Sequence, residues 1–278
     1  WPYDFATLKK VSTLIDTKNF TELADGIDSY TFSKDEKQVL IANNSNQIFR
    51  HSFTADYFLY NLSTKVLTKV LEQVQEPTFS PDGTKIAFAK ENNLFIYEVN
   101  SKKTIQVTSD GKKNAIINGI IDWVYEEEFA FVRAFDWSTD SKKLAFIRFD
   151  ESQVPEFSMN VFQKDLYPSV ETFKYPKAGE KNAEVSLHIY NVSSNTSKQI
   201  NLGNYSDFYI ARMKWTNDAN VLSAQVLNRH QDNLDLIFVD GNSGAAKVVL
   251  NEKDKAYVDV TDNLTFLKDN SFIWTSEK

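Results

Sequence analysis

The 278-residue chain contains no cysteine, only 8 glycines and only 3 histidines. Without cysteine, neither a disulfide framework nor a thiolate metal site can form, and the redox compartment is left open. The histidines are His51, His188 and His230, and no two of them have the i, i+4 spacing of a helical zinc site. No glycine-rich phosphate loop is present either. We therefore expect neither a metal nor a cofactor.

An excess of basic residues is also missing. The chain has 31 Lys and Arg against 38 Asp and Glu, which gives a net charge of −7 and a pI near 5.1. Nucleic-acid backbones are bound by basic surfaces, so we expect no nucleic-acid partner. No apolar run reaches the ~18 residues that a membrane-spanning helix needs. With 42% hydrophobic residues, the composition is that of a globular chain with a sizeable core.

A complete hydrolase site is missing as well. The nearest approach to the Gly-x-Ser-x-Gly nucleophile elbow is Gly-Asn-Ser-Gly-Ala at residues 241–245, which ends in alanine. The motif has meaning only between a strand and a helix, whereas Ser243 stands between two expected strands. We therefore predict that this chain contributes no catalytic residue.

What the chain does contain is a repeat. An aromatic residue that ends one strand, a polar turn with Asp at its third position, and a second apolar strand recur five times. This pattern is typical of a β-hairpin, because Asp and its polar neighbours form hydrogen-bonded turns. The aromatic residues of the five copies are Phe32, Phe79, Trp137, Trp215 and Phe266.

The repeat unit has four strands. In the copy that begins at Phe79, the hairpin is followed by two further apolar segments at residues 93–99 and 104–108. Four-stranded units repeated in this way are the signature of propeller blades. We predict an all-β fold, a partial arc of about four to five four-stranded blades. In a later copy, His188 lies in an expected strand, where we predict that its side chain faces outward.

The second and third units are longer than the others and carry insertions at about residues 115–130 and 151–180. The later insertion contains Pro155, Pro168 and Pro176 and is rich in apolar residues, which favours an exposed two-stranded ribbon. Exposed apolar segments of this size usually mark an interface, so we expect an arm that joins two copies of the protein. The alternative is that the arm folds back over its own blades.

The earlier insertion contains Asp-Trp-Val-Tyr-Glu-Glu-Glu at residues 122–128. Asp122 can cap a short helix that starts here. Successive helical residues are about 100° apart, so Glu127 and Glu128 can converge on one small cation. The alternative is that the glutamates form an ordinary solvated helix face.

Three motifs in this chain resemble those of a known family. They are the acidic motif at residues 122–128, Phe-Arg-His-Ser-Phe-Thr-Ala-Asp-Tyr at residues 49–57, and the segment 166–179 that ends in Tyr-Pro-Lys-Ala-Gly. In this order they resemble the N-terminal β-propeller domain of dipeptidyl peptidase IV, of the bacterial type, in the prolyl oligopeptidase family of serine peptidases. The resemblance implies that residues 1–278 are part of an eight-bladed ring.

The resemblance also implies functional residues. Glu127 and Glu128 would bind the free N-terminal ammonium of a peptide substrate, and Arg50 would bind a substrate carbonyl and pair with a glutamate when the site is empty. The family releases Xaa-Pro and Xaa-Ala dipeptides with a Ser-Asp-His triad in a C-terminal α/β-hydrolase domain, which this chain lacks. A homodimer formed through the arm at residues 151–180 and a periplasmic or otherwise exported location are further expectations.

Two other functions fit the same residues. A non-catalytic propeller of this family would bind peptide termini or protein partners without hydrolysing them. A tripeptide-releasing relative would also use a propeller of this type, although the adjacent pair Glu127 and Glu128 favours dipeptide release.

Overall fold

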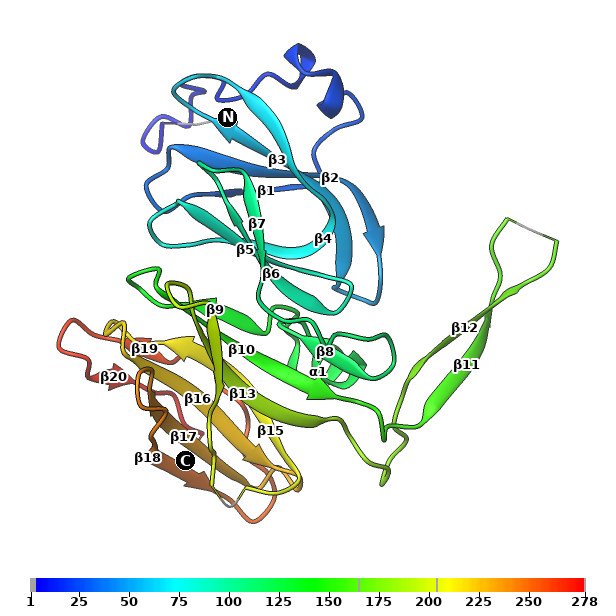
Figure 1. Cartoon of the computed structure of the whole chain (residues 1–278), viewed down its shortest axis with the longest axis vertical. Helices are drawn as coiled ribbons and strands as arrows, with labels where there is room; N and C mark the ends of the chain where they lie inside the picture. The colour runs from blue at the N-terminus through cyan, green and yellow to red at the C-terminus, as the bar shows by residue number, and fades with distance from the viewer. Residues whose placement is uncertain (1–3, 165, 204, 278) are drawn as a thin grey trace.

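The computed structural model describes residues 4–164, 166–203 and 205–277. The described chain consists mainly of antiparallel sheets that follow one another along the molecule, with a ribbon that projects to one side (Figure 1). Before the first sheet lie two short 3₁₀ helices, η1 (Thr17–Asn19) and η2 (Thr21–Leu23). Leu23 is buried and packs with residues of the first blade.

The first two blades share one seven-stranded sheet, in which the strands pair in sequence order. Its long fourth strand belongs to both blades, since residues 67–74 pair with the preceding strand and residues 75–79 with the following one. Register shifts bend the strand where it passes between the blades. The strands are β1 (Ser29–Phe32), β2 (Gln38–Gln47), β3 (Phe53–Asn61), β4 (Leu67–Phe79), β5 (Lys85–Lys90), β6 (Asn93–Glu98) and β7 (Lys103–Gln106).

The third blade is interrupted by the only α-helix of the described residues, α1 (Trp123–Phe129). The strands before and after this helix, β8 (Ile116–Asn118) and β9 (Phe135–Trp137), both pair with β10. The chain therefore leaves the blade after β8 and forms α1. It then returns as β9, which pairs with β10 as β8 does. The blade is completed by β10 (Lys143–Asp150), β13 (Glu184–Asn191) and β14 (Thr196–Gln199).

The fourth blade is a regular four-stranded sheet, and a short hairpin follows it. The blade strands are β15 (Phe208–Trp215), β16 (Val221–Asn228), β17 (Asn233–Asp240) and β18 (Ala246–Lys253), and the hairpin strands are β19 (Thr265–Phe266) and β20 (Phe272–Ile273). Four blades and the hairpin of another confirm the predicted arc, and the described sheets form no closed ring.

The recurring turn explains the repeat in physical terms. The hydroxyl of Ser80 donates to Asp82 at 2.6 Å and accepts from the backbone N–H of Lys85 at 3.0 Å, which closes the hairpin. Ser33 and Ser138 make the same two kinds of contact in their blades. Such local side-chain bonds satisfy backbone groups that the tight turn leaves unpaired.

The aromatic residue of the repeat joins neighbouring blades. Indole Nε1 of Trp137 donates to the carbonyl of Thr78 in the second blade at 3.2 Å. Trp215 makes the equivalent bond to the carbonyl of Asp136 in the third blade at 3.0 Å. Both tryptophans are buried, so each combines apolar packing with a satisfied N–H group. The third blade is therefore held at a fixed position on each side.

The insertion at residues 151–180 forms a two-stranded ribbon, as predicted, from β11 (Glu156–Val161) and β12 (Ser169–Lys174). It projects well beyond the sheets (Figure 1). At its base, Phe173 contacts Phe49 of the first blade and Tyr175 contacts Trp123 of α1. Near the tip, Phe162 is 79% exposed. The alternative that the arm folds back over its own blades is therefore wrong for its outer part.

Candidate functional site

The acidic motif lies on α1, whose start and end have local causes. Oδ1 of Asp122 accepts a hydrogen bond from the backbone N–H of Tyr125 at 3.0 Å, as predicted for the helix cap. The helix ends at Ala130, which adopts the left-handed conformation with φ 54°. Burial raises the pKa of Asp122 to about 6.

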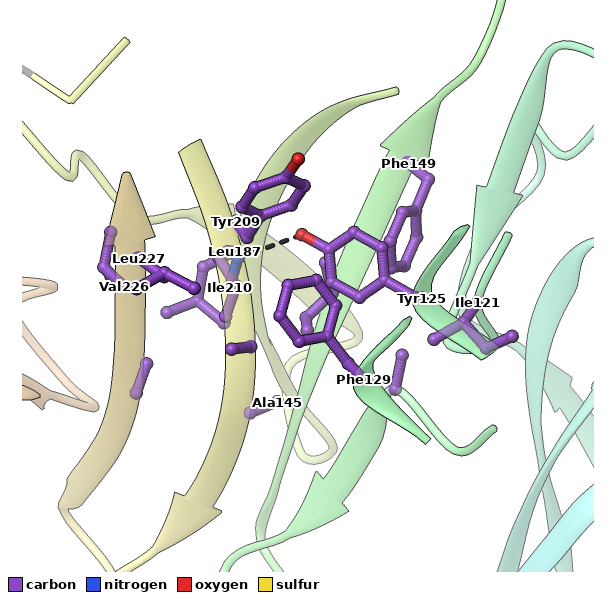
Figure 2. Close-up of a cluster of buried hydrophobic side chains, with 14 of the residues drawn as sticks. Ile121, Tyr125, Phe129, Ala145, Phe149, Leu187, Tyr209, Ile210, Val226 and Leu227 are labelled. Carbon is purple, nitrogen blue, oxygen red and sulfur yellow. Dashed lines mark hydrogen bonds between the residues drawn. The ribbon is translucent and has the colours of Figure 1, made fainter. Parts of the chain in front are cut away.

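Tyr125 fixes α1 between the third and fourth blades. Its fully buried hydroxyl accepts a hydrogen bond from the backbone N–H of Ile210 in β15 at 3.0 Å (Figure 2). Its ring packs against Phe149 of the third blade and Tyr209 of the fourth, with centroid distances of 4.8 and 6.0 Å. Phe129, one turn later, also contacts Tyr209. The acidic motif is thus carried by a helix that two blades hold rigidly.

The three glutamates of the motif have three different environments. Glu126 is fully buried, and its Oε1 accepts the backbone N–H groups of His51 and of Ser52, the latter at 2.9 Å. Glu127 is partly buried and forms an ion pair with Arg50. Glu128 is exposed, and no hydrogen bond or ion pair to it exists within the described ranges. Burial thus falls from the first glutamate to the third.

The ion pair joins two distant parts of the chain. Nε of Arg50, in the loop between β2 and β3, lies 3.0 Å from Oε2 and 3.2 Å from Oε1 of Glu127. The side chain of Arg50 is 69% exposed and that of Glu127 is 20% exposed. An exposed pair of this kind stabilises a fold by only roughly 0–1 kcal/mol, so a ligand can separate it at small cost.

A cavity of about 540 Å³ lies behind this pair, between the blades and the base of the arm. Phe49, Trp123 and Phe173 contribute to its apolar lining, and Asp122 and Glu151 supply carboxyl groups. Glu151 is buried, and its pKa is raised to about 7, first by burial and then by the charge of Asp122. The back of the acidic helix therefore faces a cavity lined by both apolar and charged side chains.

The family model described as the dipeptidyl peptidase IV N-terminal region matches residues 33–278. The chain belongs to this family. It is 34% identical over 269 residues to dipeptidyl aminopeptidase B of Saccharomyces cerevisiae, an alignment that covers 93% of this chain and 33% of that protein. The crystal structure of Porphyromonas gingivalis dipeptidyl peptidase 4 matches it with a TM-score of 0.93 and 38% identity over 99% of this chain and 40% of that one.

The chain thus spans about a third of the length of the curated relative and 40% of the length of the solved one. Its similarity to the solved dipeptidyl peptidase covers the arc of blades, α1 and the arm. The chain is a propeller portion of the dipeptidyl peptidase type, in agreement with the sequence-based prediction.

In this member of the dipeptidyl peptidase IV N-terminal region family, Ser243 lies in the turn between β17 and β18, as predicted. Its hydroxyl donates to Asp240 at 2.8 Å and has no histidine beside it in the part of the chain that the structure describes. A serine without a base is a weak nucleophile. Ser243 is therefore a turn residue.

The prediction for His188 is wrong. The ring is half-buried and stacks on Phe146 with a centroid distance of 5.1 Å, and it shares a hydrogen bond of 2.9 Å with Ser186. Burial and the charge of Arg148 lower the pKa of His188 to about 4. Neighbouring blades cover both faces of this sheet, so strand alternation does not decide which side chains are exposed.

Among the described residues, no cluster of three or more His, Asp or Glu side chains has metal-binding geometry. In the same residues, no helix is long and apolar enough to cross a membrane. Sequence reasoning identified Arg50 and Glu127, which the structure brings together, and Glu128, which follows them on the exposed side of α1. It missed Glu126, because nothing in three consecutive glutamates marks the first as buried.

Proposed function

We propose that this chain holds the free N-terminus of a peptide for a dipeptidyl peptidase. Glu127 and Glu128 bind the terminal ammonium, and Arg50 binds a carbonyl oxygen near that terminus. The observation that carries the proposal is the accessible ion pair between Arg50 and Glu127, next to the exposed carboxylate of Glu128, which has no ion-pair partner among the described residues. A cation and two anions at one open site complement a peptide terminus, which offers an ammonium group and carbonyl oxygens.

The energies support this exchange of partners. A terminal amine has a pKa of about 7.7 to 8.0 and is largely cationic at neutral pH. At 4 Å and an effective dielectric of 20, each charge pair is worth about 4 kcal/mol before desolvation. An arriving ammonium can therefore compete with the guanidinium of Arg50 for Glu127. Arg50 is then free to donate to a peptide carbonyl, which neutral substrates of any sequence provide.

Binding the terminus fixes the distance between the site and each peptide bond of the substrate. Only a peptide bond at a fixed distance from the ammonium can reach a nucleophile placed elsewhere in the protein. In our proposal that nucleophile belongs to a Ser-Asp-His triad in a C-terminal α/β-hydrolase domain of the parent protein, which releases Xaa-Pro or Xaa-Ala dipeptides. The 278 residues themselves supply recognition and gating.

Two further proposals concern the parent protein as a whole. Its apolar arm, residues 151–180, packs against the arm of a second copy to form a homodimer. Support comes from the exposure of Phe162, Tyr167 and Val170 on a ribbon that projects beyond the sheets (Figure 1). A periplasmic or otherwise exported location is proposed from family membership alone.

The experiment that tests the proposed function compares Gly-Pro-nitroanilide with its N-acetylated form as substrates of the parent protein. Acetylation removes the positive charge and leaves the rest of the substrate in place. We expect kcat/KM to fall by at least 100-fold. Equal rates on the two substrates would contradict the proposal, and absence of hydrolysis of either would favour a non-catalytic propeller.

A further inference from the structure

Glu126 is a buried carboxylate for which the proposed function gives no role. It is fully buried, yet only one of its oxygens has hydrogen-bond partners, while Oε2 has none within the described ranges. Burying a charged group is costly unless specific partners compensate for it. The compensation comes from one place, the backbone N–H groups of His51 and Ser52, which both donate to Oε1.

These two donors belong to the loop that carries Arg50. The loop is closed by its own hydrogen bonds, from Ile48 N to the carbonyl of Ser52 at 2.8 Å and from Phe49 N to the hydroxyl of Ser52 at 3.2 Å. These bonds make the loop a compact unit. Glu126 contacts this unit at the residue directly after Arg50.

We propose that Glu126 is a positioning residue that fixes the backbone of Arg50 for substrate binding. This inference rests on the proposed function. On α1, Glu126 holds the backbone of the loop and the adjacent Glu127 holds the side chain of Arg50. When a substrate ammonium takes Glu127, the guanidinium loses its partner, but Glu126 still keeps the loop against the helix. Arg50 then needs no rearrangement beyond its side chain to reach the carbonyl.

Gln47, at the end of β2, also holds the loop, because its side-chain Nε2 donates to the backbone carbonyls of Phe49 and of Arg50, the latter at 3.1 Å. The ring of Phe49 contacts Phe173 at the base of the arm, with a centroid distance of 5.9 Å. Neither of these two contacts ties the loop to α1, so the hydrogen bonds to Oε1 of Glu126 hold the backbone next to Arg50 against the helix that carries Glu127. A carboxylate suits this role, since charged acceptors form stronger bonds to backbone N–H groups than neutral ones do.

A double-mutant cycle in the parent protein tests this, with Gly-Pro-nitroanilide as the substrate. We expect Glu126→Ala to lower kcat/KM by about tenfold or more, mainly through KM, because a displaced loop weakens substrate binding. In an Arg50→Ala background the same substitution should cost less than threefold, because Glu126 acts through Arg50. Glu126→Gln keeps one acceptor oxygen and should restore most of the loss. Glu184→Ala, at an exposed position on β13, is the matched control.

An equal loss in both backgrounds would overturn the inference and assign Glu126 a general structural role. So would an unchanged KM in Glu126→Ala. If Glu126→Ala does not fold, Glu126→Asp, which is one methylene too short to reach the loop, replaces it in the cycle. The preference of the wild-type protein for a substrate with a free amine is measured first. If this preference is absent, the proposed function is contradicted. If it is present but the two substitutions have additive effects, only the role of Glu126 is contradicted.

Discussion

Arg50 and Glu127 are separated by 77 positions in the sequence, and their side chains meet at 3.0 Å on the open side of a short helix. The arginine comes from a loop of the first blade and the glutamate from an insertion in the third. Only the arc of blades brings them together, and the bond from Trp137 to the carbonyl of Thr78 joins the second and third blades within that arc. The site is therefore a product of the propeller arrangement rather than of any one blade.

The first prediction concerns Glu128. In the parent protein, Glu128→Ala should lower kcat/KM for Xaa-Pro nitroanilides by about 30-fold or more, since it removes one of two charges that face the ammonium. Protein stability should change little, because Glu128 is exposed and makes no bond within the described chain. The measurement is steady-state kinetics together with thermal unfolding. Full activity in a variant of unchanged stability would remove Glu128 from the site.

The second prediction concerns the 278-residue chain alone. Incubated with Gly-Pro-nitroanilide, it should release no nitroaniline above the buffer rate, because Ser243 has no histidine beside it among the described residues and lies in a hairpin turn. Absorbance at the wavelength of nitroaniline is the readout. Hydrolysis by purified chain that disappears in Ser243→Ala would show that our interpretation of this serine is wrong.

The third prediction concerns the arm. Deleting residues 157–172 from the parent protein should convert a dimer into a monomer, since the deletion removes the exposed apolar surface of β11 and β12. Light scattering measures the mass directly. Substitution of Glu184, which lies outside the arm, serves as a control. A dimer that survives the deletion would exclude the arm as the main contact.

The fourth prediction concerns pH. The pKa of Glu151 is raised from 4.5 to about 7 in the folded chain, so the folded state binds the proton more tightly than the unfolded state does. This contribution to stability is fully present below about pH 4.5 and is lost as the pH rises through about 7.

Glu151→Gln should therefore raise the stability relative to wild type as the pH increases from about 4.5 to 7, by on the order of 3 kcal/mol in total. Denaturant unfolding of both proteins at each pH gives the difference and cancels the effects of other carboxylates. A difference that stays constant between pH 4 and 8 would mean that Glu151 does not titrate in this range.

Sequence reasoning predicted most of the fold, because the repeat depends on hydrogen bonds between residues that are close in the sequence. Ser80 and Asp82 form their turn from bonds between near neighbours, and Asp122 caps α1 in the same way. Such bonds depend on spacing alone. The aromatic residue of each repeat marks the end of the first strand of a blade.

The remaining features depend on long-range packing. Glu126 looks identical to Glu127 and Glu128 in the sequence, and only the approach of His51 and Ser52 distinguishes it. His188 was assigned to an exposed face by strand alternation, but Arg148 and Phe146 lie beside it in the folded blade. Both cases need the relative positions of segments that are distant in the chain.

The central claim is that Glu127 recognises the charge of a peptide terminus. Its most direct test measures kcat/KM of the parent protein and of Glu127→Gln on Gly-Pro-nitroanilide and on its N-acetylated form. We predict that wild type prefers the free amine by at least 100-fold and that Glu127→Gln loses most of this preference, mainly through slower turnover of the free amine. A variant that retains the wild-type preference would contradict the claim.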